Sequence, residues 1–280
     1  MKTARNNASK GKVALVTGAS SGIGEATAQR LAEAGYTAYG TSRRGVLPGE
    51  RAFKMLALDV TSDESVESAV AELLRLEGRI DLLVNNAGFG VAPAGAEESS
   101  LDQARAIFDT NFFGIVRMTR AVVPHMRRAG GGRILNIGSV LGFIPMPYGA
   151  LYAATKHAVE GYSESLDHEL RSFGIRVSVI EPAYTRTKFD ANFLEPDAKR
   201  DEYRAVRAHL NTLLPAVMAK SDEPAIVAEV VVQAAGADRP KLRYTAGRTA
   251  AQLRLLRRFA PAHLVDAGVR KELQLGRVRA

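Results

Sequence analysis

The sequence has no cysteine, no tryptophan and no long apolar run among its 280 residues. Without cysteine it has no thiolate nucleophile, no cysteine-ligated zinc and no iron–sulfur cluster. No segment approaches the roughly 18 consecutive apolar residues of a membrane-spanning helix. The basic start is followed only by the short run Val13–Thr17, which is too short for the apolar region of a secretory signal. We therefore expect a cytoplasmic protein.

The histidines and serines also lack the spacing of two common catalytic sites. Histidine stands at positions 125, 157, 168, 209 and 263, and none of these belongs to an H-E-x-x-H pattern. The segment Gly161–Ser165 lacks the second glycine of a hydrolase nucleophile elbow and falls within an expected helix. The sequence therefore predicts no metal site and no serine-hydrolase site.

Acidic residues are scarce near the end of the chain, and this explains the net charge of +8. Residues 241–280 contain ten Lys or Arg but only Asp266 and Glu272, so they carry the whole excess, whereas residues 13–240 carry −4. A mildly acidic body is not typical of a protein that binds polyanions. We therefore expect no nucleic-acid partner for the body of the protein.

Short apolar runs alternate with longer amphipathic stretches along residues 13–247. Several runs, such as Val13–Val16, are apolar throughout, which is typical of strands buried on both faces. The alternation predicts a single α/β domain with a doubly wound, seven-stranded parallel sheet and helices on both faces. The expected strands are 13–18, 37–41, 53–60, 80–84, 133–137, 176–180 and 241–245, and the expected helices are 22–34, 63–77, 100–129, 151–173 and 221–235.

Three segments lie outside this alternation. Residues 1–12 are expected to form a flexible basic N-terminus. The connection 183–220 is unusually long and contains apolar residues at helical spacing from Tyr203 to Val217, so we expect a lid over the substrate. Residues 248–280 mix leucines with arginines and predict two basic amphipathic helices. These helices would cap the body or a neighbouring subunit, or lie on a membrane surface.

A glycine-rich loop follows the first expected strand. Its sequence, T-G-A-S-S-G-I-G, occupies residues 17–24 and leads into an expected helix. Glycines let the backbone approach a pyrophosphate, which binds the N–H groups at the start of the helix. The spacing is a variant of the usual dinucleotide fingerprint, and the expected contacts are Gly18, Ser20, Ser21, Gly22, Ile23 and Gly24.

The end of the second strand favours NADP(H) over NAD(H). An NAD site usually has an acid about twenty residues beyond the glycine loop, where it binds the ribose 2′-hydroxyl. This chain has Ser42, Arg43 and Arg44 there, and no acid. A hydroxyl and a guanidinium suit a 2′-phosphate. Ser42 and Arg43 are therefore expected cofactor contacts.

Polar residues follow several later strands in a pattern that suits proton transfer. Ser139 follows the fifth strand after one glycine. Tyr152 and Lys156 share one face of the next helix because they are four residues apart. A phenol of pKa about 10 is a weak base at neutral pH, but a nearby ammonium lowers its pKa by about one to three units. Tyr152 can then exchange a proton with a carbonyl or alcohol oxygen, while Ser139 donates a hydrogen bond to the same oxygen.

Together, T-G-x-x-x-G-x-G, N-N-A-G at residues 85–88, the serine and Y-x-x-x-K resemble the short-chain dehydrogenase/reductase family. The resemblance covers about residues 13–190 and implies a Rossmann-type fold. It also adds Asn111 to Ser139, Tyr152 and Lys156 as a catalytic residue, because in the family this asparagine supports the lysine through a water relay. The cofactor contacts that it implies are Asp59, Val60, Asn86, Ala87, Gly88, Tyr152, Lys156, Pro182 and Thr187. The family pattern P-G-x-x-x-T has Ala183 in place of its glycine, so Thr187 matches by position.

The residues expected to face the substrate are mostly apolar. They predict a lipophilic ketone or alcohol, and the chain is similar to the 17β-hydroxysteroid and retinol dehydrogenase branch of the family. Members commonly form homodimers or homotetramers through the helices expected at 100–129 and 151–173. The substrate-facing residues are Phe89, Val140, Phe143 and Tyr184, with Phe189, Phe193 and Leu194 of the lid.

Two other functions fit parts of the sequence. A cofactor-binding regulator with a dormant site would be expected to have lost Ser139, Tyr152 or Lys156, and none is lost. The alternative is a membrane-surface or nucleic-acid-associated cofactor-binding protein that acts through its basic tail. Its signature would be steeply salt-dependent association with anionic vesicles or DNA, abolished by deletion of residues 248–280.

Overall fold

The computed structural model describes residues 11–45, 49–187, 189 and 193–277. Most of the N-terminal segment expected to be flexible therefore lies outside the described residues. No helix in the described part is long and apolar enough to cross a membrane.

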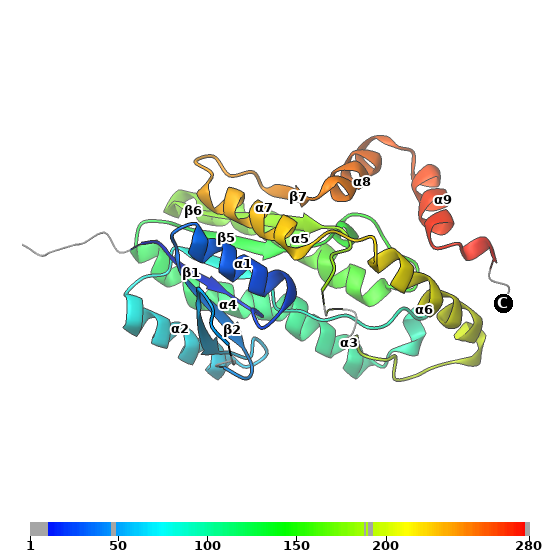
Figure 1. Ribbon diagram of the computed structural model, residues 1–280, viewed down its shortest axis with the longest axis horizontal. Coiled ribbons are helices and arrows are strands. Elements are labelled where there is room, and N and C mark those ends of the chain that lie inside the picture. Colours follow the sequence, from blue (N-terminus) through cyan, green and yellow to red (C-terminus); the bar gives the residue numbers. More distant parts are fainter. Residues whose placement is uncertain (1–10, 46–48, 188, 190–192, 278–280) are drawn as a thin grey trace, which may run out of the picture.

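A seven-stranded sheet forms the centre of the molecule (Figure 1). All its neighbouring strands are parallel, and their order is β3-β2-β1-β4-β5-β6-β7, which confirms the predicted fold class. The first strand has all four residues fully buried, as expected of a strand covered on both faces. The strands are β1 (Val13–Val16), β2 (Thr37–Ser42), β3 (Lys54–Ala57), β4 (Leu82–Asn85), β5 (Gly132–Ile137), β6 (Ile175–Pro182) and β7 (Arg243–Ala246).

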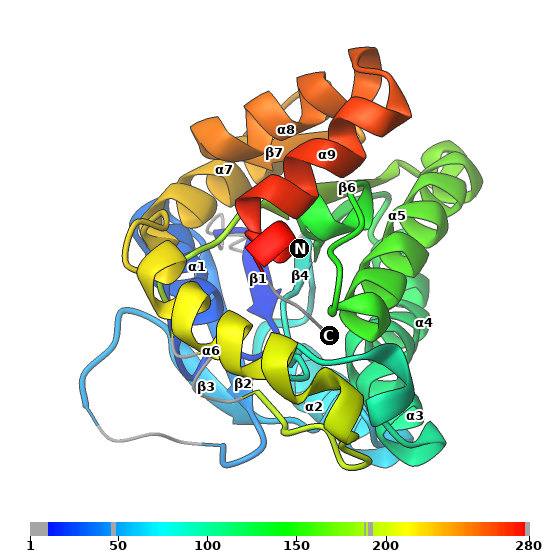
Figure 2. The same cartoon turned by 90° about the vertical axis from the view of Figure 1, so that its right-hand side faces the viewer.

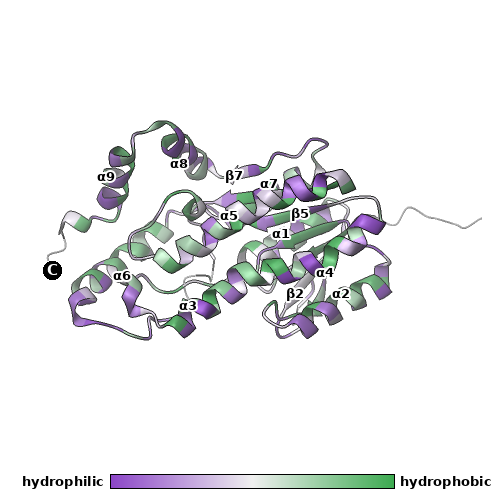
Figure 3. Cartoon of the chain, turned by 180° about the vertical axis from the view of Figure 1, so that it is seen from behind, coloured by the Kyte–Doolittle hydropathy of each residue, from purple (hydrophilic) through white to green (hydrophobic). Residues whose placement is uncertain are grey.

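Helices cover both faces of the sheet, and the alternation of side chains along β1 shows why. Val13 and Leu15 pack in one core cluster, with α2 (Asp63–Glu77), α4 (Gly114–Arg128) and α5 (Ala150–Leu170). Ala14 and Val16 pack in the other, with α1 (Gly22–Glu33) and α7 (Pro224–Gly236). Figure 3 shows the sheet at the centre of the molecule, surrounded by helices that carry both apolar and polar residues.

The helix expected over residues 100–129 is interrupted. It consists of α3 (Leu101–Phe108), a π-helical turn (Asp109–Phe113) and α4. The wider turn rotates the following residues relative to a regular helix, and Asn111 within it is only 1% exposed. Such turns occur frequently at functional sites.

The long connection after β6 contains α6 (Arg204–Met218), at the place where apolar spacing predicts a helix. The buried carboxylate of Glu98 holds this segment to the chain before α3. It accepts hydrogen bonds from the N–H groups of Gly95 and Arg200, both at 2.8 Å, and pairs with Arg207 of α6. A single buried acid thus fixes the start of α6.

The last described segment forms α8 (Arg248–Phe259) and α9 (Ala262–Glu272). Leu273 and Leu275, which follow α9, are buried against Val206 and Leu210 of α6. In Figure 2, α6, α9 and α5 surround the edge of the sheet where β1 and β4 end. The C-terminal helices therefore pack on the body, over the elements that follow β5 and β6.

Gly24 and Gly161 both lie in helices, but only Gly24 is packed tightly, against the loop after β1. A Cβ on Gly24 of α1 would lie 2.3 Å from the carbonyl oxygen of Gly18 and 2.4 Å from Nδ2 of Asn86. Gly161 of α5 has no atom within 4 Å of such a Cβ. Alanine is favoured over glycine in a helix by about 1 kcal/mol, whereas overpacking costs about 1–3 kcal/mol.

We therefore expect Gly24→Ala to lower the free energy of unfolding and Gly161→Ala to leave it equal or raise it by up to about 1 kcal/mol. Denaturant unfolding of both variants beside the wild type checks this. Equal stability of the two variants would contradict the close approach at Gly24.

Candidate active site

The polar residues singled out in the sequence gather at one edge of the sheet. Gly18, Asn86 and Ser139 follow β1, β4 and β5, and these three strands are neighbours in the sheet. The carboxyl ends of parallel strands meet at the same edge, and ligands of open α/β sheets bind there. The site is thus a direct consequence of the strand order.

The glycine loop and the end of β4 are tied together by hydrogen bonds. The buried hydroxyl of Thr17 accepts from the N–H groups of Asn86 at 2.9 Å and Ala87 at 3.0 Å. The Asn86 amide in turn donates to the carbonyl oxygens of Thr17 and Gly18. Thr17 was not among the predicted site residues, and its place as the first residue of the glycine loop is the signal that could have identified it.

The loop has the shape of a phosphate cradle. Gly18 and Gly22 have φ angles of +67° and +60°, which residues with a Cβ rarely adopt. Ser21 caps α1 with no side-chain hydrogen bond to the helix, so an anion can bind its first-turn N–H groups. A Cβ on Gly22 would lie 3.0 Å from Cβ of Thr187, so the loop and Thr187 are near enough to contact one cofactor. These residues fit the pyrophosphate of a dinucleotide.

At the end of β2, Ser42 is buried and Arg43 is exposed. The buried Ser42 hydroxyl donates to the carbonyl oxygen of Gly45 at 3.2 Å, whereas Arg43 is exposed. Asp59 is near enough to Arg43 for its charge to matter. Hydrogen bonds from Thr61, followed by the charges of Arg43 and Arg117, lower the pKa of Asp59 despite partial burial. Val60 beside it packs against Gly114 of α4.

Asn111 connects the loop after β4 to α5. Its side chain accepts from the N–H of Phe89 at 3.0 Å and donates to the Phe89 carbonyl at 2.9 Å. It also donates to the hydroxyl of Thr155 at 3.3 Å. Because Thr155 precedes Lys156, the π-helical turn positions the helix that carries the lysine.

Lys156 is a buried cation beside Tyr152. Its ammonium donates to the carbonyl oxygen of Ile137 at 2.8 Å and lies 5.5 Å from the centre of the Tyr152 ring. Burial lowers the pKa of Lys156 to about 8, and the charge of Glu160 opposes this effect. Folding thus brings the predicted pair together, and an ammonium so near a phenol favours its phenolate form.

Ser139 lies at the end of β5 and is 8% exposed. Its Oγ accepts from the N–H of Leu141 at 3.1 Å, at the start of a short 3₁₀ helix (Val140–Gly142). This bond uses the oxygen as an acceptor and leaves the hydroxyl proton for another partner. Ser139 is therefore suited to donate to a substrate oxygen.

Aromatic side chains of the connection after β6 lie near Tyr152. The Phe189 ring is 5.8 Å from the Tyr152 ring and 5.3 Å from that of Phe193, both edge-on. A Cβ on Gly90 would lie 2.7 Å from Phe193, so the loop after β4 closes on the same rings. An apolar wall thus borders Tyr152.

The predicted substrate residues occupy different surroundings. Val140 is buried, Phe89 is half-buried, and the Tyr184 hydroxyl contacts the Met146 sulfur at 3.6 Å. The Phe143 ring lies under Arg254 of α8, 5.2 Å from its guanidinium carbon, so this ring also contacts the C-terminal helices. Substrate contact by these four residues stays a prediction.

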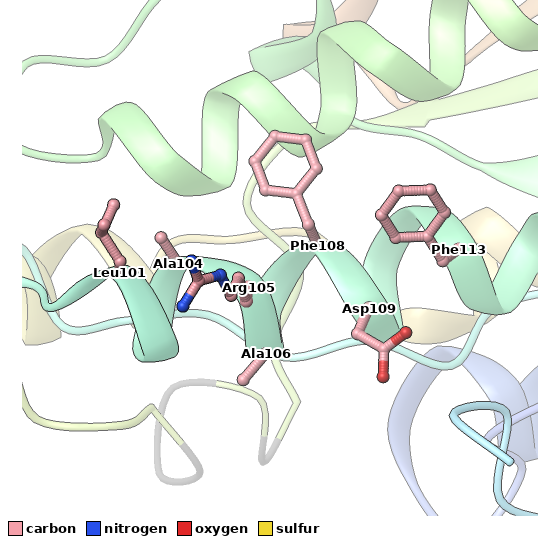
Figure 4. A pocket seen from close by; sticks show the side chains of 7 residues that line it. All are labelled: Leu101, Ala104, Arg105, Ala106, Phe108, Asp109 and Phe113. Atoms are coloured by element: carbon pink, nitrogen blue, oxygen red, sulfur yellow. The ribbon is translucent and has the colours of Figure 1, made fainter.

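Two further features of the described residues bear on other predictions. They contain no group of three or more His, Asp or Glu that could hold a metal ion. An open hollow lies along α3 and the π-helical turn (Figure 4). It is lined by Leu101, Ala104, Arg105, Ala106, Phe108, Asp109 and Phe113. Self-association through these helices stays a prediction, as does membrane contact by the tail.

Comparison with known proteins identifies similar chains. Residues 12–198 match the family model described as short chain dehydrogenase. A 3-ketodihydrosphingosine reductase from Bacteroides thetaiotaomicron is 43% identical over 196 residues, 69% of this chain and 71% of that protein. Retinol dehydrogenase 8 from Bos taurus is 36% identical over 256 residues, 83% of this chain and 80% of that protein.

Solved structures agree with this fold. A short-chain dehydrogenase from Streptomyces avermitilis has a TM-score of 0.76 at 32% identity, covering 95% of this chain and 97% of that one. A 3-ketoacyl-(acyl-carrier-protein) reductase from Brucella melitensis, complexed with NADH, has a TM-score of 0.71 at 29% identity, covering 84% and 96%. A serine dehydrogenase complexed with NADP+ has a TM-score of 0.69 at 30% identity, covering 83% and 93%.

The matched residues contain the glycine loop, the Asn86 segment, Ser139, Tyr152 and Lys156, the same residues that the fold gathers at one edge of the sheet. The chain is an oxidoreductase of the short-chain dehydrogenase/reductase family.

Proposed function

We propose that the protein is an NADP(H)-dependent reductase or dehydrogenase that interconverts a lipophilic ketone and its alcohol. The buried ammonium of Lys156, 5.5 Å from the Tyr152 ring and bordered by the Ser139 loop, is the observation that carries this proposal. Such a pair gives a tyrosine that can both donate and accept a proton near neutral pH.

The chain's own residues account for the proton and the orientation of the substrate. The nicotinamide, when bound, supplies or accepts the hydride. During reduction, the Tyr152 hydroxyl gives its proton to the carbonyl oxygen, and the charge of Lys156 stabilises the phenolate that remains. Ser139 donates a hydrogen bond to the same oxygen as its negative charge grows. Oxidation of the alcohol is the reverse, with the Tyr152 phenolate taking the hydroxyl proton.

The apolar surroundings support a lipophilic substrate. Phe189 packs on Tyr152 and on Phe193, so a substrate beside the tyrosine meets aromatic carbon. The names of two similar proteins, a 3-ketodihydrosphingosine reductase and a retinol dehydrogenase, also refer to lipophilic compounds.

Tyr152→Phe is expected to lower kcat by about 10²- to 10⁴-fold, because the variant has no proton to transfer. The measurement is oxidation of NADPH against a panel of carbonyl compounds, from short polar ones to steroid-, retinoid- and sphingoid-like ones. Tyr162→Phe is the matched control, since Tyr162 is on the same helix and packs on Phe112. Undiminished turnover by Tyr152→Phe would refute the mechanism, and turnover of short polar carbonyls alone would refute the lipophilic pocket.

We also propose that Arg43 binds the 2′-phosphate and sets the preference for NADP(H). Its exposed side chain lies beyond β2, where the chain has no acid for a ribose hydroxyl. One similar structure contains NADH and another contains NADP+, so similarity alone does not determine which cofactor is preferred.

Arg43→Gln should raise the KM for NADPH by about ten- to a hundredfold, since hydrogen bonds to a charged group contribute about 1.5–3 kcal/mol. Steady-state kinetics with NADPH and NADH on the same preparation measure this. NADH is the internal control, because it has no 2′-phosphate. An equal change in both KM values would show that Arg43 does not bind the 2′-phosphate.

A further inference from the structure

Two glutamates are buried behind the catalytic lysine. Glu160 lies one helical turn after Lys156 on α5, whereas Tyr152 lies one turn before it, so the lysine stands between the two. Glu181 is in β6 and is fully buried, and Glu160 is 7% exposed. Ionised carboxylates are rarely buried to this extent unless they are paired.

Two arginines from separate elements pair with these carboxylates. Arg243 of β7 lies 2.8 Å from Glu160 Oε2 and 3.7 Å from Glu181 Oε1, through the same nitrogen. It also reaches the half-exposed Glu164 at 2.7 Å. Arg254 of α8 pairs with Glu181 Oε1. The other oxygen of each buried glutamate, Glu160 Oε1 and Glu181 Oε2, is buried with no hydrogen-bond partner.

The cluster lies directly against the loop that carries Ser139. A Cβ on Gly138 would be 3.2 Å from Glu160 Oε1, and one on Gly142 would be 3.1 Å from the same atom. These two glycines flank Ser139, so the carboxyl of Glu160 packs beneath the serine's backbone.

The C-terminal helix α8 contacts the same loop from outside. The Arg254 guanidinium covers the Phe143 ring, and Arg257 donates to the Phe143 carbonyl at 3.0 Å. Arg254 is thus shared between the buried glutamates and the loop after Ser139.

We propose that Arg254 of the C-terminal extension is a positioning residue for the reaction, acting through Glu181, Arg243 and Glu160 on the charge beside Lys156 and on the Ser139 loop. The proposal rests on the function proposed above. It assigns to α8 a part in catalysis that the nucleotide-binding body alone does not supply.

The charge balance of the cluster explains how the effect reaches the lysine. Burial raises the pKa of Glu160 and brings that of Glu181 to about 7, while the two arginines oppose the rise. The charge of Arg254 therefore acts on both carboxyls, although it pairs directly only with Glu181.

The charged groups that face this pair come from three elements. They are Lys156 and Glu164 of α5, Arg243 of β7 and Arg254 of α8, with His168 beyond Glu164. Gly138 and Gly142 place only uncharged atoms against the pair. Loss of Arg254 makes the potential at Lys156 and Tyr152 more negative, whereas neutralising Glu160 makes it more positive.

The two changes should therefore move the pH profile of alcohol oxidation in opposite directions. A more negative potential disfavours the Tyr152 phenolate, so Arg254→Gln shifts the half-maximal rate to higher pH, and Glu160→Gln shifts it to lower pH. We expect about half a unit to one unit for each, the order typical of a neighbouring charge. Arg254→Lys keeps the charge and should restore the wild-type midpoint.

The measurement is the pH dependence of kcat/KM for the wild type, Arg254→Gln, Arg254→Lys and Glu160→Gln, with Arg258→Gln as the matched control. Arg258 is exposed on the same helix and stacks on Phe259, outside the cluster. Midpoints that do not move, or that move in the same direction in Arg254→Gln and Glu160→Gln, overturn the proposal.

Two outcomes separate this proposal from the function on which it rests. If Tyr152→Phe abolishes turnover but Arg254→Gln behaves as Arg258→Gln does, only the role of Arg254 fails. If Tyr152→Phe is fully active, the proposed mechanism fails first. Should Arg254→Gln not fold, the profiles of Arg254→Lys and Glu160→Gln decide, since the first must match the wild type and the second must shift to lower pH.

Discussion

A lysine ammonium buried at the carboxyl edge of a parallel sheet is the constraint on which the site depends. Lys156 lies between the carbonyl of Ile137, the ring of Tyr152 and the carboxyl of Glu160. A buried cation needs such partners, because an isolated charge in an apolar interior is very costly. The elements that supply them, β5, α5 and the π-helical turn through Thr155, must therefore keep their positions for the charge to persist.

The sequence predicted the parts of this arrangement that depend on local patterns. Apolar runs such as Val13–Val16 predicted buried parallel strands, and the glycines of residues 17–24 predicted a cradle because few other residues adopt their backbone angles. The spacing of Tyr152 and Lys156 placed both on one helix face. Each of these signals lies within about two helical turns or one strand, where chain geometry alone fixes which residues are neighbours.

Contacts between distant residues could not be predicted in this way. Glu98 and Arg207 are 109 residues apart, and Glu181 and Arg254 are 73 apart, so nothing in either local sequence indicates its partner. The π-helical turn also escaped prediction, because its residues continue the amphipathic pattern of the helices on both sides. The family resemblance singled out Asn111, but its hydrogen bonds to Phe89 and Thr155 could not be predicted from the sequence.

The contacts of the basic tail, residues 248–280, change the interpretation of its charge. Its net charge suggested an acidic partner outside the molecule, yet Arg254 pairs with a buried glutamate of the body and Arg257 with the loop after Ser139. Part of the excess charge thus neutralises acids within the same chain. The tail therefore contacts both a buried carboxylate behind Lys156 and the loop after Ser139.

The central claim is that Lys156 makes Tyr152 the most acidic phenol of the protein. NMR titration of tyrosines labelled at Cζ measures this directly, since the chain has eight tyrosines and Tyr152→Phe assigns the signal. The account predicts one tyrosine that ionises well below the others and returns to the ordinary range in Lys156→Met. Titration of Tyr152 at the ordinary pH in the wild type, or no change in Lys156→Met, would contradict it.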